Sequence, residues 1–204
     1  MYELLVLSLL MKFPLHAYLI SKISNDTIGP WEQVSRGTLS TLLNKLDKAG
    51  LIQEADPATV PFPTERPSRT FEITNKGKDR FFELMMDTKK NVGNYPKIFH
   101  IKAIYLEFLS EEDQLYLVNH YIKYCQTAID HIKTQQLEFD ENPQQVKSIQ
   151  GTSFYSVIGS LMRLNTEQWS LERQWATHLK EQIMMSIKND KRKDHSNDTR
   201  MGKR

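Results

Sequence analysis

The 204-residue chain lacks most features that would assign it to an exported, membrane or disulfide-bonded class. It has a single cysteine, Cys125, so no disulfide can form within the chain, and a reducing cytoplasm is the expected location. No apolar run approaches the roughly 20 residues that a membrane-spanning helix needs, so no membrane partner is expected. The apolar segment 2–12 has neither a basic leader nor a small-residue cleavage site, which favours a buried helix over a signal peptide.

Signals for catalysis and for metal binding are also missing. The six histidines and one cysteine show no ligand spacing such as HxxxH or CxxC, and no glycine-rich phosphate loop is present. Cys125 falls on an apolar helix position, where a small buried side chain is more common than a nucleophile. We therefore expect no enzymatic activity, no cofactor and no metal site.

Charge gives little guidance, because the formal net charge is only +2 and no segment is a polybasic domain. Non-specific attraction to phosphates should be modest, so binding to nucleic acid would depend on a few placed basic residues. Residues 189–204 are highly charged and lack apolar periodicity, which predicts a disordered tail.

The first half of the chain shows the order helix, helix, helix, strand, strand, helix. Helices are predicted over 2–12, from Pro14 to about Asn25 with its apolar residues (including Tyr18) facing inward, and over 36–48, ending at Gly50. Strand candidates at 51–55 and 69–74 flank a loop with four prolines, and Thr74 can cap a last helix. This order predicts a winged helix-turn-helix domain over residues 1–92.

The helix over 36–48 has an apolar side of leucines and a polar side that contacts either solvent or a binding partner. A solvated face is the ordinary interpretation, but within a winged helix this segment is the recognition helix that enters a DNA major groove. The wing arginines can enter a minor groove, or they can simply keep a charged turn soluble. The predicted DNA-binding residues are Arg36, Thr38, Ser40, Thr41, Asn44, Lys45, Lys48, Arg66 and Arg69.

The second half reads as helices only, and two long stretches carry apolar residues at alternating spacings of three and four. These heptad patterns predict a helical dimerisation domain over residues 93–188. An antiparallel hairpin within one chain would use the same residues, and the sequence leaves both alternatives open. The predicted dimerisation residues are Leu115, Val118, Ile122, Ile129, Leu161, Leu164, Leu171 and Trp175.

Aromatic residues are dense in this half, where an aromatic effector could stack and meet a basic residue such as Lys102 or Arg163. A core and dimer seam explains any one of these aromatic residues more simply, so no effector site is assigned.

Three segments together resemble the PadR family of bacterial transcriptional regulators: PLHAYLISKI, WEQVSRGTLSTLLNKLDKAGLI and ERPSRTFEITNKGK, within residues 4–85. The chain departs from the family pattern at Ala17, where glycine is usual, at Ser40, where tyrosine is usual, and at Thr41, where proline is common. A tyrosine contact to DNA therefore cannot be carried over. The resemblance implies a repressor whose C-terminal helices build the dimer, and some family members release DNA on binding phenolic acids.

The sequence thus predicts a mainly α fold, with an N-terminal winged helix-turn-helix followed by an α-helical dimerisation domain. The predicted function is a homodimeric DNA-binding repressor that reads a pseudo-palindromic operator in double-stranded DNA and responds to a small aromatic carboxylate. The alternative is a winged helix used as a protein-interaction module without sequence-specific DNA binding. A weaker third idea is a small-molecule carrier whose ligand has no effect on DNA.

Overall fold

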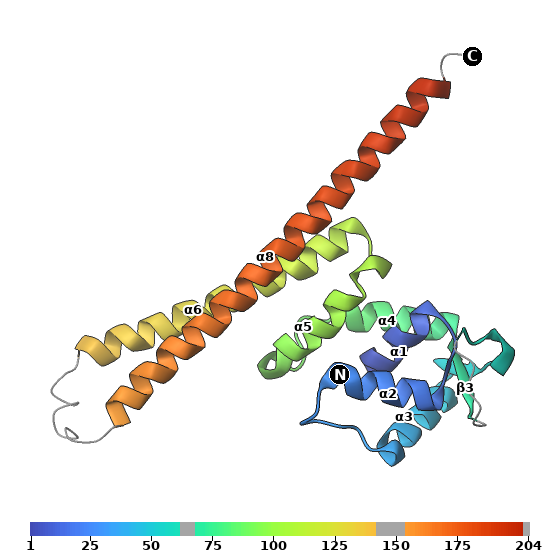
Figure 1. Cartoon of the computed structure of the whole chain (residues 1–204), viewed down its shortest axis with the longest axis horizontal. Coiled ribbons are helices and arrows are strands. Elements are labelled where there is room, and N and C mark those ends of the chain that lie inside the picture. Colours follow the sequence, from blue (N-terminus) through green and yellow to red (C-terminus); the bar gives the residue numbers. More distant parts are fainter. Residues whose placement is uncertain (62–67, 142–153, 202–204) are drawn as a thin grey trace. The chain divides into compact units, whose positions relative to one another are not determined.

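The computed structural model describes residues 1–61, 68–141 and 154–201, and it separates into two compact units, Met1–Leu109 and Ser110–Arg204. The predicted boundary at residue 92 lies inside the first unit, and the division into functional domains at that residue stays a prediction. Within the described ranges, no helix is both long enough and apolar enough to cross a bilayer. Figure 1 shows the elements of each unit coloured along the chain.

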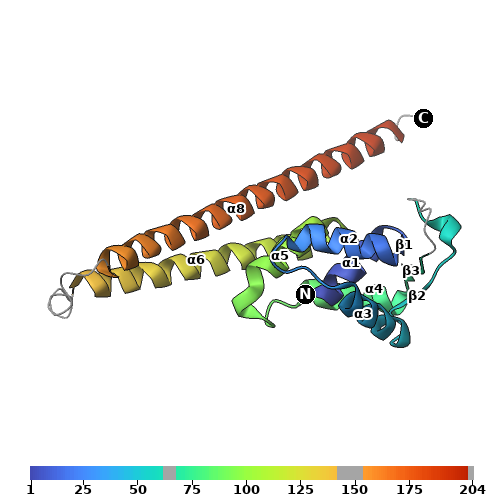
Figure 2. The same cartoon turned by 60° about the horizontal axis from the view of Figure 1, so that its bottom comes forward.

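The first unit combines helices with a small three-stranded sheet. The strands β1 (Leu15–His16), β2 (Ile52–Glu54) and β3 (Thr70–Ile73) are antiparallel in the order β1-β3-β2. Both Leu15 of β1 and Glu54 of β2 lie opposite Phe71 of β3. Figure 2 shows the sheet beside α2, α3 and α4. This arrangement confirms the predicted winged helix. The elements are α1 (Tyr2–Lys12), β1 (Leu15–His16), α2 (Ala17–Ile28), α3 (Arg36–Lys48), β2 (Ile52–Glu54), β3 (Thr70–Ile73), α4 (Asn75–Met86) and α5 (Tyr95–Ile104), with 3-10 turns at Pro57–Thr59, Val92–Asn94 and Leu106–Phe108.

The start of the second helix differs from the prediction. Leu15 and His16 pair with β3 as a short strand, and the helix begins only at Ala17. A hydrogen bond of 2.8 Å between His16 Nδ1 and Thr70 Oγ1 holds the buried His16 to β3, which explains why the segment is extended. The predicted inward position of Tyr18 is wrong: the side chain is 52% exposed, and Ile20 occupies the buried position.

Two contacts hold α4 to the rest of the unit. Arg80 donates from Nε to Glu3 of α1 at 2.8 Å, and this hydrogen bond is the main cause that raises the pKa of Arg80. At the start of α4, Thr74 accepts from the backbone N–H of Gly77 at 3.0 Å, as an N-cap does. A Cβ on Gly77 would lie 2.0 Å from the carbonyl oxygen of Leu51, so only glycine permits this approach.

The second unit consists of α6 (Glu111–Glu141) and α8 (Phe154–Met201), which pack side by side and run antiparallel (Figures 1 and 2). The Tyr121 hydroxyl donates to Glu172 at 2.8 Å, and the Tyr121 and Trp175 rings meet edge-on with centroids 6.4 Å apart. Tyr124 meets Trp169 in the same way at 5.6 Å. The intramolecular hairpin that the sequence left open is therefore present.

The helix α8 continues to Met201, through most of the stretch predicted as a disordered tail. No proline or glycine interrupts residues 160–201, so nothing in the backbone chemistry ends the helix earlier.

Candidate nucleic-acid interface

The position of α3 is fixed by its two ends and by one apolar face. Ser35 caps the helix, because its side chain accepts from the backbone N–H of Thr38 at 3.1 Å. Gly50, with φ of 70°, ends the last turn and donates to the carbonyl of Asp47 at 2.8 Å. The buried face carries Leu39, Leu43 and Leu46, while Leu42 is half-buried, which confirms the predicted apolar side.

All the residues of α3 that the sequence predicts as DNA contacts lie on its exposed side. They are Arg36, Thr38, Ser40, Thr41, Asn44, Lys45 and Lys48. Their contact with DNA stays a prediction, but their common placement on one solvent-facing surface is what such contact requires.

These side chains differ in what they already bind within the chain. Arg36, Lys45 and Lys48 have no hydrogen bond or ion pair to any residue that the structure describes. The Thr41 hydroxyl donates to the carbonyl of Gly37 at 3.0 Å, and it therefore keeps only acceptor capacity. Thus the three cations are the groups most available to phosphate oxygens.

Arg69 lies at the base of the wing, and its guanidinium is already engaged. Nε donates to Glu54 of β2 at 2.5 Å, Nη1 to the Asn44 side chain at 2.8 Å, and Nη2 to Asp47 at 3.1 Å. The group also lies over the Phe71 ring, 4.8 Å from its centroid. Its pKa is raised, first by the hydrogen bond to Glu54. Asp47 and Glu54 were not among the predicted site residues, although hairpin pairing of β2 with β3 brings Glu54 near the residue before β3.

The other predicted wing arginine, Arg66, lies outside the described residues. On the described side of the loop, Asp56 caps the 3-10 turn Pro57–Thr59 by accepting from the backbone N–H of Ala58 at 2.9 Å, and Val60 is buried.

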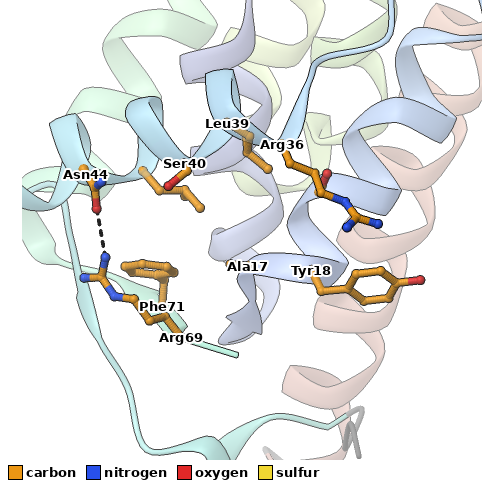
Figure 3. A pocket seen from close by; sticks show the side chains of 10 residues that line it. Ala17, Tyr18, Arg36, Leu39, Ser40, Asn44, Arg69 and Phe71 are labelled. Carbon is orange, nitrogen blue, oxygen red and sulfur yellow. Dashed lines mark hydrogen bonds between the residues drawn. The ribbon is translucent and has the colours of Figure 1, made fainter. Parts of the chain in front are cut away.

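A cavity of about 310 Å³ opens on the same surface, between α2, α3 and β3 (Figure 3). Leu39, Leu43 and Phe71 are among its apolar lining residues, and Arg36 and the exposed Tyr18 lie at one side of it in Figure 3. The hydrogen bond between Asn44 and Arg69 lies at the opposite side in Figure 3. Because Tyr18 was predicted to face the core, this cavity was not predicted from the sequence.

The two basic residues named for an effector have different environments. Lys102 is 0% exposed, its Nζ donates to the backbone carbonyl of Asp87 at 2.7 Å, and burial lowers its pKa to about 8. It is therefore not a free surface cation for a carboxylate. Arg163, on α8, is exposed.

The predicted dimerisation residues divide between the two long helices. On α6, Val118 and Ile129 are buried within the chain, and Leu115 and Ile122 are half-buried. On α8, the predicted residues remain 39–68% exposed, and they continue a heptad line with Val157. We call this line the outer stripe of α8: Val157, Leu161, Leu164, Leu171 and, at its edge, Trp175, whose ring also meets Tyr121 of α6.

Cys125 is buried on α6, as predicted, and burial raises the pKa of its thiol to about 11. Among the residues that the structure describes, no three His, Cys, Asp or Glu side chains gather as a metal site would need.

Comparison with known proteins gives a family match over the winged helix. Residues 6–83, from within α1 to within α4, match the family model described as Transcriptional regulator PadR-like family. No curated protein matches the chain in sequence.

Solved structures resemble the chain at low identity. Bacillus subtilis PadR in complex with operator DNA is 17% identical, over 89% of this chain and 98% of that chain, with a TM-score of 0.35. A PadR-like transcriptional regulator from Bacillus cereus is 16% identical, over 91% and 99%, with a TM-score of 0.36. The Vibrio cholerae virulence activator AphA is 15% identical, over 91% and 99%, with a TM-score of 0.35.

The family match confirms the resemblance that the sequence motifs predicted, and it covers the whole of α2, α3 and the strands. The family is one of transcription regulators and not of enzymes. The winged helix at residues 6–83 therefore matches the PadR-like family of transcriptional regulators.

Proposed function

We propose that this regulator is a repressor that binds a pseudo-palindromic operator in double-stranded DNA as a homodimer. The observation that carries the proposal is the exposed side of α3, where Arg36, Lys45 and Lys48 have no partner among the described residues. Polar and cationic groups along one helix suit base edges and phosphates, which set the register of a protein on DNA. Bound to chromosomal DNA, the protein would be located in the cytoplasm.

The specific contacts belong to this chain and not to the family pattern. Arg36, at the first position of α3, is proposed to meet a guanine edge or a phosphate. Ser40 and Thr41 take the places where the family pattern has tyrosine and proline, so the contacts there involve short hydroxyl side chains. Lys45 and Lys48 lie in the last turns and are proposed to bind phosphates.

The outer stripe of α8 supports the homodimer. Its leucines are exposed, Leu171 to 68%, and they repeat at heptad spacing, which suits a second apolar helix better than water. A second copy offers the same stripe, as a two-fold interface requires. Dimerisation would present two α3 helices to two half-sites, which is the reason to expect a pseudo-palindromic operator.

A small aromatic carboxylate is the proposed effector. The cavity beside α3 supports this idea, because its volume of about 310 Å³ lies at the lower end of the range of ligand sites and Arg36 stands at its edge. The test is to titrate the protein–DNA complex with p-coumaric acid and, as a control, with phenol, which lacks the carboxylate. Release of DNA by the acid alone is expected, and unchanged binding with both compounds would reject this effector class.

DNA binding itself is tested by fluorescence anisotropy with the intergenic DNA upstream of the protein's own gene, at several salt concentrations. Arg36→Ala, Lys45→Ala and Arg66→Ala should each weaken binding and flatten its salt dependence by about one unit of slope per lost phosphate contact. Lys89→Ala removes an equal charge from an exposed residue outside α3 and the wing, and it should change neither quantity.

If the three variants bind with the affinity and salt slope of the unaltered protein, the assigned surface is wrong. If the unaltered protein binds no DNA in any tested promoter, the protein-interaction alternative replaces the proposal.

A further inference from the structure

Arg69 joins three parts of the DNA-facing surface. Its side chain donates hydrogen bonds to Glu54 on β2 and to Asn44 and Asp47 on α3. Its backbone carbonyl accepts from the N–H of Ala17, the first residue of α2, at 2.9 Å. Arg69 therefore connects the base of the wing to α3 through its side chain and to α2 through its backbone carbonyl.

The charge around Arg69 is unfavourable for a direct phosphate contact. Two carboxylates, from Asp47 and Glu54, form ion pairs with one guanidinium, so the group of three carries a net negative charge. Three of the five N–H donors of the guanidinium are used within the chain. The guanidinium also lies over the Phe71 ring, 4.8 Å from its centroid. Arg36, by contrast, has its charge uncompensated within the described residues.

The bond to Arg69 also fixes the side chain of Asn44. Only the carbonyl oxygen of an amide can accept from Arg69 Nη1, so the amide nitrogen of Asn44 must take the other position. The part of exposed Asn44 that is left for DNA is then its pair of N–H donors, which suits acceptors in the major groove such as guanine O6 and N7. Arg69 thereby influences which base edge Asn44 can read.

We propose that Arg69 is a positioning residue, which holds the wing against α3 and orients Asn44, and that it does not itself neutralise a phosphate. This inference rests on the proposed DNA-binding function. It changes the role expected for Arg69 from direct contact with DNA to support of the wing and of Asn44.

Two substitutions of Arg69 separate the two roles. Arg69→Ala should weaken operator binding about tenfold, as the loss of one charge-assisted hydrogen-bond set does, while the salt slope stays unchanged. Arg69→Lys should weaken binding nearly as much, because a lysine keeps the charge but cannot make the forked contacts to three acceptors. A slope reduced by about one unit in Arg69→Ala, with full affinity in Arg69→Lys, would overturn the proposal.

Substitution of Asp47 and Glu54 provides a second test, because a phosphate-contact role and a positioning role for Arg69 predict changes of opposite sign in DNA affinity. Asp47→Asn and Glu54→Gln each remove a negative charge from a surface that faces a polyanion, which by electrostatics alone strengthens DNA binding. If Arg69 is a positioning residue, both variants weaken binding instead, because each removes one arm of the support. Glu72→Gln is the matched control, since Glu72 lies on β3, accepts from Gln53 at 2.6 Å and does not touch Arg69.

Stronger binding by Asp47→Asn and Glu54→Gln, equal to that of Glu72→Gln, would refute the positioning role. Hydrogen exchange without DNA gives a readout that does not depend on the proposed function. In Arg69→Ala, the backbone amides of β2 and β3 should exchange faster than in the unaltered protein, while those of α6 should not change. If the unaltered protein binds no DNA but Arg69→Ala shows this local loss of protection, the support role is retained and the proposed function is rejected. If the exchange of these amides is unchanged in Arg69→Ala, the support role is rejected.

Discussion

The exposed sides of α3 and of α8 differ in chemistry, although both belong to amphipathic helices with a buried side. The exposed side of α3 carries cations and short polar groups, whereas the outer stripe of α8 carries leucines and a tryptophan. A polar cationic surface gains most from a polyanion, and an apolar heptad stripe gains most from another apolar helix. The difference supports two proposed kinds of partner, DNA for α3 and a second copy of the chain for α8, and the predictions below test that contrast.

The largest effect is expected from charging the outer stripe of α8. The double variant Leu164→Glu/Leu171→Glu should abolish dimerisation, because four acidic groups would meet in the paired stripes. Operator affinity should then fall between about 10² and 10⁴-fold, since one α3 loses the effective concentration that the second provides. Native mass spectrometry and fluorescence anisotropy measure the two quantities.

The matched control for this variant is Asn165→Glu, an exposed position of α8 beside the stripe. It should leave both dimer and affinity intact. A double variant that remains dimeric would show that the stripe is not the dimer interface.

A second contrast concerns two helical glycines, one in each unit. Gly77→Ala should destabilise the chain by about 3 kcal/mol, because the new Cβ would overlap the carbonyl oxygen of Leu51. Gly159→Ala in α8 meets nothing within 4 Å and should stabilise it by about 0.5–1 kcal/mol through lower chain entropy. Urea unfolding monitored by circular dichroism measures both, and equal effects would mean that the close approach at Gly77 is absent.

Buried titratable groups should give the two units opposite responses to alkaline pH. Lys102 has a folded pKa of about 8, below its ordinary 10.5 because of burial, so the unfolded chain binds more protons between these values. Cys125 has a folded pKa of about 11, above its ordinary 9.0 because of burial, so the folded chain binds more protons between these values. The Lys102 contribution to stability therefore rises from pH 8 to 10.5, and the Cys125 contribution falls from pH 9 to 11.

Each contribution should change the free energy of unfolding by about 3 kcal/mol at most, given 1.36 kcal/mol per pKa unit. Urea unfolding at pH 7.5, 9 and 10 checks the signs. Lys102→Met should remove the rise, and Cys125→Ala should remove the fall. A Lys102→Met variant with the pH dependence of the unaltered protein would contradict the burial of a titrating amine.

The smallest effect is expected from one surface lysine in each unit. Lys48→Ala should reduce operator affinity roughly three- to tenfold and lower the salt slope by about one unit, because one phosphate contact is lost. Lys123→Ala removes the same charge from an exposed position of α6 and should change neither value. Equal losses in the two variants would indicate a general charge effect in place of a defined surface on α3.

Much of the winged helix was predictable because it depends on local chemistry. The spacing of Leu39, Leu43 and Leu46 predicted the buried side of α3, and Gly50 predicted its end. The alternation around Phe71 predicted β3. The sequence did not predict β1, because a two-residue strand has no period of its own and exists only through its pairing with β3.

The heptad patterns were equally visible in the sequence, but their partners were not. Both helices carry apolar residues at spacings of three and four, so each could pack within the chain or against another chain. Tertiary packing buries Val118 and Ile129 of α6 within the chain and leaves the outer stripe of α8 exposed. Periodicity shows which residues share a face, but not what covers that face.

The candidate DNA-binding site also has features that the sequence predicted and features that only the tertiary structure showed. The sequence by itself determined which residues of α3 share its polar side, because helical period fixes the direction of each side chain. Only the tertiary structure decided that Arg69 is bound by Asn44, Asp47 and Glu54 while Arg36 is not, because these partners come from separate elements. A charge counted in a sequence becomes available to DNA only if folding leaves it unpaired, and that depends on contacts between residues far apart in the chain.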